Sequence, residues 1–159
     1  MIGKFRSVGC IAFGAAIGCG GAADGGVGPD IPGSTFGLIQ TRVFADNCTN
    51  CHTSGSAFAK QSGLSLDRAT AYRNLVNAPS VDPGARNDGL LRVVPGDAKN
   101  SLLYQKLILW DPNHTGNYGA PMPLGGQSLT IGQIDYIRRW INAGAPETGE
   151  VVDASCSVI

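Results

Sequence analysis

Three residues, Cys48, Cys51 and His52, restrict how this chain can fold more than any other feature. The two thiols stand three positions apart and the imidazole follows directly. With five Cys and two His among 159 residues, composition alone would produce such a triplet roughly 0.002 times. The spacing is typical of covalent haem attachment, in which each thiol forms a thioether with one vinyl group of the porphyrin. We therefore expect one covalent haem c, with His52 beneath the iron as its proximal ligand.

Two other uses of paired cysteines agree less well with the surrounding sequence. In thioredoxin-like proteins the pair opens a helix, whose N-terminus lowers the thiol pKa. Here a helical pattern precedes Cys48, and Gly and Ser follow the motif. A structural zinc site needs four Cys or His ligands, and beyond the motif the chain offers only His114, Cys156 and the early cysteines. Haem attachment remains the favoured interpretation.

Residues 1–18 have the pattern of a lipoprotein signal peptide. Lys4 and Arg6 precede an apolar run over residues 8–17, which is too short to cross a bilayer as a mature helix. The run ends in Ala-Ile-Gly-Cys, which resembles a bacterial lipobox and predicts lipidation of Cys19. Acylation there would anchor the protein to a membrane, in the periplasm or at the cell surface. Cleavage by an ordinary signal peptidase nearby is the alternative.

The rest of the chain divides into a linker, one domain and a tail. Residues 19–34 are rich in Gly and Pro, which is typical of a flexible linker. We expect a single domain over residues 35–145, followed by a polar tail over residues 146–159. Loss of the signal leaves ten basic residues against twelve acidic ones, a balance that gives no reason to expect a nucleic-acid partner. Cys156, in the tail, is left without a partner once the signal peptide, the lipid and the haem account for the other cysteines.

Capping residues and apolar periodicity predict an all-α, loop-rich domain, marked best at its two ends. The first helix is expected over residues 36–47, with Ser34 or Thr35 as its cap. The last helix is expected to begin with a capping box at Thr130 and to end at Gly144. One apolar face should run along it, formed by Ile131, Ile134, Ile137, Trp140 and Ile141.

Weaker patterns lie between these two helices. A helix is expected from Asp67, as its N-cap, to Leu75, and another from Asp97 or Asn100 to about Leu109. A short apolar run over residues 90–94 predicts a brief strand. The segments that join them are expected to be loops.

The motif and the helix before it resemble those of class I cytochromes c. In that family a short N-terminal helix ends in the Cys-x-x-Cys-His motif, and Phe44, four residues before Cys48, stands where the family usually carries an aromatic residue. The resemblance implies a small cytochrome c fold, in which the N- and C-terminal helices cross around one haem. It also implies that Ile137 and Trp140 pack on Phe44 or on Ile39.

Met122 is the second residue that the resemblance singles out. It lies between two prolines in a Gly-rich loop, and it is the one methionine left once Met1 departs with the signal. In class I cytochromes c, a methionine before the last helix and followed by Pro is the second axial ligand, so the resemblance implies that Met122 is the distal ligand of the haem iron. His114 is the alternative ligand, because imidazole also binds haem iron. A core-filling role for Met122, with an open sixth position, is the remaining reading.

The signal pattern and the resemblance together imply a secreted, lipid-anchored cytochrome that carries single electrons between redox partner proteins. With His52 and Met122 both bound, the iron would have no free position for a substrate. The sequence offers no nucleophile with a positioned base, so we expect an electron carrier and no enzyme. A haem enzyme or gas sensor, with Met122 displaced or never bound, is the alternative. An accessory domain of a complex that holds the chemistry elsewhere is a third.

Overall fold

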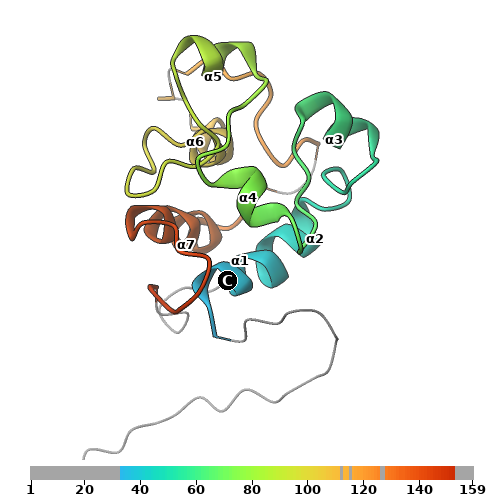
Figure 1. Ribbon diagram of the computed structural model, residues 1–159. Helices are drawn as coiled ribbons and strands as arrows, with labels where there is room; N and C mark the ends of the chain where they lie inside the picture. The colour runs from blue at the N-terminus through green and yellow to red at the C-terminus, as the bar shows by residue number, and fades with distance from the viewer. Residues whose placement is uncertain (1–32, 112, 115, 126–127, 153–159) are drawn as a thin grey trace, which may run out of the picture.

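The computed structural model describes residues 33–152 except residues 112, 115, 126 and 127. The predicted signal peptide, the lipidation site Cys19, nearly all of the predicted linker and Cys156 lie outside the described residues. The helices within them are α1 (Thr35–Ile39), the π-helical η1 (Gln40–Phe44), α2 (Ala45–Asn47), α3 (Ala57–Ser62), α4 (Ala71–Leu75), α5 (Pro83–Asn87), α6 (Leu102–Ile108) and α7 (Ile131–Asn142). Pairing between extended segments of this part of the chain consists of isolated bridges. The all-α prediction is thus confirmed for the described residues (Figure 1).

Segments α1, η1 and α2 follow one another without a break and form one helix close to the predicted range. Ser34 caps it, as predicted, because its hydroxyl oxygen accepts a hydrogen bond from the N–H of Gly37 at 2.9 Å. In the middle turn the N–H of Ala45 donates to the carbonyl of Gln40, five residues back, so this turn is π-helical. The helix ends at Cys48, the first residue of the Cys-x-x-Cys-His motif.

Helix α7 has the predicted capping box. The hydroxyl of Thr130 accepts from the N–H of Gln133, and the side chain of Gln133 accepts from the N–H of Thr130. Ile137, Trp140 and Ile141 are fully buried, as predicted. The prediction for Ile131 was wrong, since this side chain is 89% exposed. Ile131 is the first residue of the helix, before the turns that meet the core.

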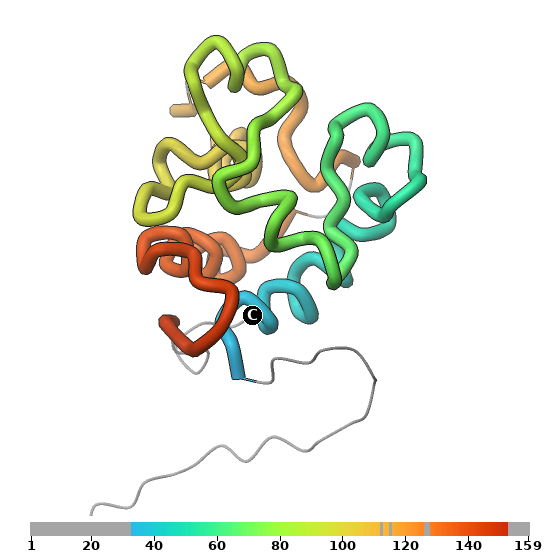
Figure 2. Tube along the Cα trace, in the orientation of Figure 1, coloured from blue at the N-terminus to red at the C-terminus, as the bar shows by residue number. Residues whose placement is uncertain are grey.

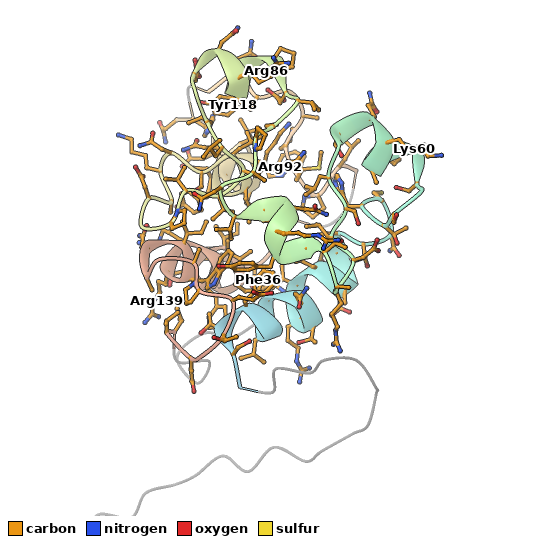
Figure 3. The ribbon with its side chains drawn as sticks, viewed as in Figure 1. Phe36, Lys60, Arg86, Arg92, Tyr118 and Arg139 are labelled. Carbon is orange, nitrogen blue, oxygen red and sulfur yellow. The ribbon has the colours of Figure 1, made fainter. Side chains whose placement is uncertain are left out.

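Helices α1 and α7 pack against each other through aromatic rings. Trp140 stacks on Phe36, with ring centroids 5.2 Å apart and planes inclined at 26°. Tyr72 of α4 meets the same phenylalanine edge-on at 5.2 Å, so Phe36 lies where α1, α4 and α7 come together (Figure 3). The main core continues around these rings with buried Ile39, Val43, Phe44, Leu75, Ile137 and Ile141.

The predictions for the elements in the middle of the chain were only partly correct. Helix α4 begins at Ala71 rather than after Asp67, because the Asp67 carboxylate bonds to Thr53 and Ser54 instead of capping a helix. Residues 90–94 form isolated bridges and no strand. Helix α6 begins after Ser101, later than predicted.

Two short helices stand where loops were expected. The hydroxyl of Ser56 caps α3 by accepting from the N–H of Ala59 at 3.0 Å. The carboxylate of Asp82 caps α5 in the same way, accepting from the N–H of Ala85 at 3.0 Å.

Residues 146–152, which belong to the predicted polar tail, pack along the domain. The hydroxyl of Thr35 accepts hydrogen bonds from the N–H groups of Val151 and Val152, at 2.9 and 3.1 Å. The indole N–H of Trp140 donates to the carbonyl of Pro146 at 2.9 Å. Val152 is buried in the main core, so the packed region extends at least to this residue. None of the helices described is long and apolar enough to cross a membrane.

Candidate functional site

Cys48, Cys51 and His52 lie in a tight turn directly after α2. The carbonyl of Cys48 accepts from the N–H groups of Cys51 and His52, at 3.2 and 2.9 Å. Both cysteines are free thiols and half-buried, and Cys48 packs against the main core. The turn thus brings together the three residues that the sequence predicts as the attachment site.

A backbone carbonyl fixes the imidazole of His52. Its Nδ1 lies 3.2 Å from the carbonyl oxygen of Leu64, and because that oxygen can only accept, Nδ1 carries the proton. The Ser62 hydroxyl donates to the carbonyl of Phe58 and lies 3.4 Å from the same Nδ1, where it can accept as well. Nε2 is therefore the unprotonated nitrogen, and no described residue is hydrogen-bonded to it. Histidines that bind metals usually donate their other ring N–H to a carbonyl or carboxylate in this manner.

The segment that supplies the Leu64 carbonyl is closed by the carboxylate of Asp67. This carboxylate accepts from the hydroxyl of Thr53 at 2.6 Å, from the N–H of Ser54 at 2.8 Å and from the hydroxyl of Ser65 at 2.7 Å. These hydrogen bonds, led by the one from Thr53, lower the pKa of Asp67 below its ordinary value of 3.8. They join the residues just after His52 to those just after Leu64.

Arg92, labelled in Figure 3, also bonds to this segment. Its guanidinium donates to the carbonyls of Ser62 and Gly63, at 3.2 and 2.9 Å, and to the carbonyl of Asn74 at 2.9 Å. Burial lowers the pKa of this side chain. Arg92 thereby connects α4 to the two residues that precede Leu64.

The electrostatics of Cys48 argue against a thiol–disulfide centre. Burial, with a smaller contribution from the nearby Cys51, raises the pKa of Cys48 from 9.0 to about 12. Reactive thiols in thioredoxin-like proteins have lowered pKa values, because the thiolate is the nucleophile. Cys48 is thus suited to a buried thioether and poorly suited to exchange with disulfides.

Met122 borders the same core as Cys48, although the two lie far apart in the sequence. Its half-buried side chain packs against the main core, and its N–H donates to the carbonyl of Lys106 at 3.0 Å. Figure 2 shows its segment, in light orange, descending from the top of the molecule.

His114, the alternative ligand, has both ring nitrogens engaged. Its Nδ1 accepts from the N–H of Gly116 at 3.0 Å, so the proton is on Nε2. That nitrogen lies 2.6 Å from the side-chain oxygen of Gln105, to which it donates. Ligation by His114 would break one of these bonds, whereas the thioether of Met122 needs to give up no hydrogen bond of the described structure. The geometry therefore favours Met122.

The donor set fits a haem better than a bare metal ion. No three His, Cys, Asp or Glu side chains of the described residues are grouped as a metal site requires. A haem brings four ring nitrogens to its iron, so it needs only axial ligands and covalent attachment from the chain. The chain offers two half-buried thiols, an oriented imidazole and a thioether, and of these Cys48 and Met122 pack on the same core.

Several residues of this site were missed in the sequence. Leu64 acts through its carbonyl oxygen, which leaves no signal in the residue type. Asp67 was predicted as a helix cap, but its carboxylate bonds to Ser54 and Thr53, which lie 13 and 14 positions away. Lys106 and Arg92 lie in segments where a lone basic residue ordinarily faces solvent.

Comparisons of the chain with protein-family models, with curated proteins and with solved structures find no match. The function is therefore inferred from the residues and their geometry.

Proposed function

We propose that the chain is a mono-haem c-type cytochrome that carries single electrons between redox partner proteins, with the class I cytochrome c fold. The observation that carries this proposal is the oriented His52, whose Nε2 is left free by the bond from Nδ1 to the Leu64 carbonyl, directly after Cys48 and Cys51. Cys48 and Cys51 would hold the haem c covalently, and His52 and Met122 would be its axial ligands. When bound, the iron would alternate between its ferrous and ferric forms and so take up and release one electron.

The surroundings of the ligands support this role. The bond from Nδ1 to a carbonyl makes the His52 imidazole a stronger base and fixes its ring plane. Met122 adjoins a core of Phe44, Leu75 and other apolar side chains that excludes water. A thioether opposite an imidazole favours a higher reduction potential than two imidazoles would. Two ligands from the chain would leave no position for a substrate, which favours transfer over catalysis.

We also propose that the domain is tethered to a membrane through lipid on Cys19, facing the periplasm or the cell surface. The lipobox-like sequence before Cys19 and the linker that follows it support this location.

Covalent attachment is tested by extracting the protein with acidified acetone. We expect the haem to stay with the polypeptide, because thioethers survive acid, and Cys51→Ala to weaken both attachment and folding. Haem staining of a denaturing gel gives the measurement. Quantitative extraction of haem from the unmodified protein would overturn the proposed function.

The sixth ligand decides between carrier and enzyme. We expect the oxidised protein to be low-spin, with the weak far-red absorption band of a sulfur–iron bond. Met122→Ala should abolish that band, open the iron to small ligands and lower the reduction potential, since a soft thioether favours ferrous iron. His114→Ala should change none of these.

A spectrum that ignores Met122→Ala but becomes high-spin in His114→Ala would move the ligand to His114. A protein that is high-spin before mutation would instead point to a haem enzyme or a gas sensor.

A further inference from the structure

Lys106, on α6, contacts the Met122 segment at both of its ends. Its backbone carbonyl accepts from the N–H of Met122 at 3.0 Å. Its ammonium group donates to the carbonyl of Tyr118 and, at 3.3 Å, to that of Ala120. One residue of a helix therefore bonds to three positions among residues 118–122.

The ammonium group of Lys106 is itself held in place. It lies 3.4 Å from a carboxylate oxygen of Asp82, and each of these two side chains is 18% exposed. The other oxygen of Asp82 caps α5 by accepting from the N–H of Ala85. The ion pair is thus fixed at one end to α6 and at the other to α5.

The chain passes close to this ion pair. Gly119 has a φ of +71°, which side-chain-bearing residues rarely adopt, and a Cβ there would lie 3.5 Å from the ammonium of Lys106 and 3.6 Å from the carboxylate of Asp82. The preceding Tyr118 is buried, and its hydroxyl donates to Asp88 at 3.0 Å. Tyr118 thus fixes the start of the segment, and the hydrogen bonds of Lys106 fix its backbone from Tyr118 to Met122.

We propose that Lys106 is a positioning residue, which keeps the Met122 sulfur in place for the haem iron by holding the backbone of residues 118–122. This inference rests on the proposed function. Pro121 and Pro123 restrict the backbone next to Met122 but have no N–H with which to anchor it. Hydrogen bonds from a charged, partly buried ammonium group are stronger than neutral ones. Without them the segment can move away, and an outside ligand can then reach the iron in place of the sulfur.

The test uses the full-length, haem-loaded protein in its oxidised form, with imidazole as the outside ligand. In Lys106→Met we expect a weaker far-red band and an imidazole affinity about tenfold higher, which corresponds to about 1.4 kcal/mol. Lys106→Arg should restore most of the wild-type behaviour, since guanidinium can donate to the same carbonyls. Lys99→Met, at an exposed lysine just before α6, should leave the affinity unchanged.

Hydrogen exchange gives a second readout that does not depend on spectroscopy. The amides of Tyr118, Gly119, Ala120 and Met122 should exchange faster in Lys106→Met than in the wild type, while those of α7 should not. Ile141→Val, a core change on α7, controls for lower overall stability. If Ile141→Val raises the imidazole affinity as much as Lys106→Met does, the effect is global and the inference is overturned. Wild-type affinity and exchange in Lys106→Met would overturn it as well.

Two further variants keep the outcomes distinct. If Lys106→Met does not accumulate, Lys106→Gln, which also lacks the charge, is measured in the same way and should show the same changes. If Met122→Ala itself leaves the spectrum unchanged, the proposed ligand is wrong and the role of Lys106 fails with it. If Met122→Ala has its expected effect and neither Lys106 variant does, the inference about Lys106 alone fails.

Discussion

At the scale of single residues, Asp67 shows how one carboxylate can hold together the segments around His52, the proposed proximal ligand. It joins Thr53 and Ser54, directly after His52, to Ser65, directly after Leu64. Because the folded protein holds its pKa below 3.8, the ionised form stabilises the fold. That contribution is fully present above the unfolded-state pKa and is lost as the pH falls through the lower, folded-state pKa.

We therefore expect Asp67→Asn to lower the midpoint of thermal unfolding by a few degrees at pH 7. The difference in unfolding midpoint between wild type and Asp67→Asn should become smaller as the pH falls below about 3.8, since the wild-type carboxylate then also becomes neutral. Circular dichroism melts between neutral pH and about pH 2.5 give the measurement. Asp46→Asn, at an exposed carboxylate of α2, is the control. If the difference in midpoint between Asp67→Asn and wild type stays constant with pH, the charge of Asp67 does not stabilise the fold.

At this scale the sequence supports a prediction only where the chemistry is local. Cys48, Cys51 and His52 are adjacent or nearly so, and their spacing alone indicates the attachment chemistry. The groups that orient them lie elsewhere: the partner of His52 is a carbonyl twelve residues away, and Arg92 acts on residues 29 and 30 positions before it. Contacts of this kind depend on the whole fold, so no local pattern records them.

At the scale of elements, α7 offers a direct comparison of two isoleucines with the same spacing pattern. Ile137 is fully buried and Ile131 is 89% exposed. Ile137→Ala should cost about 2–5 kcal/mol of unfolding free energy, because it leaves a cavity in the core. Ile131→Ala should change the same quantity by no more than about 0.5 kcal/mol. Chemical denaturation of both variants provides the measurement, and equal losses would contradict the burial described.

Helices with both a cap and a long apolar period were predictable. Ser34 and Thr130 mark the starts of the first and last helices, and the apolar positions within them repeat over several turns. Helix α3 and helix α5 have six and five residues, too few for a period to emerge from the sequence. Their caps, Ser56 and Asp82, are of residue types that are equally common in turns, so without a following period they do not indicate a helix.

At the scale of the whole molecule, the two ends of the described chain meet. The N–H of Thr35 donates to the carbonyl of Gly149 at 3.0 Å, and its hydroxyl accepts from Val151 and Val152. These contacts close the core formed by α1 and α7 (Figure 1). Thr35, the first residue after the predicted linker, thus lies beside residues 149–152.

The proposed lipid anchor at Cys19 predicts how the whole protein behaves in cells. We expect the mature protein to sediment with membranes, and Cys19→Ser to leave it soluble or unprocessed. Cell fractionation and mass spectrometry of the mature N-terminus provide the measurement. A soluble wild-type protein whose N-terminus is not Cys19 would contradict the anchor.

The π turn over Gln40–Phe44 decides how the first helix can tolerate a change in length. A π turn contains one residue more than an α turn. Removing one residue from it should therefore convert it into an ordinary α turn. Deleting the exposed Thr41 should leave a regular α-helix that still delivers Cys48 to the core, and haem staining should persist. An alanine inserted after Asp46 cannot be absorbed in this way. It should rotate the Cys-x-x-Cys-His motif about the helix axis by about 100°, and haem staining should be lost. Equal haem staining of the deletion and insertion variants would contradict this role of the π turn. We therefore expect the first helix to tolerate the loss of one residue but not the gain of one.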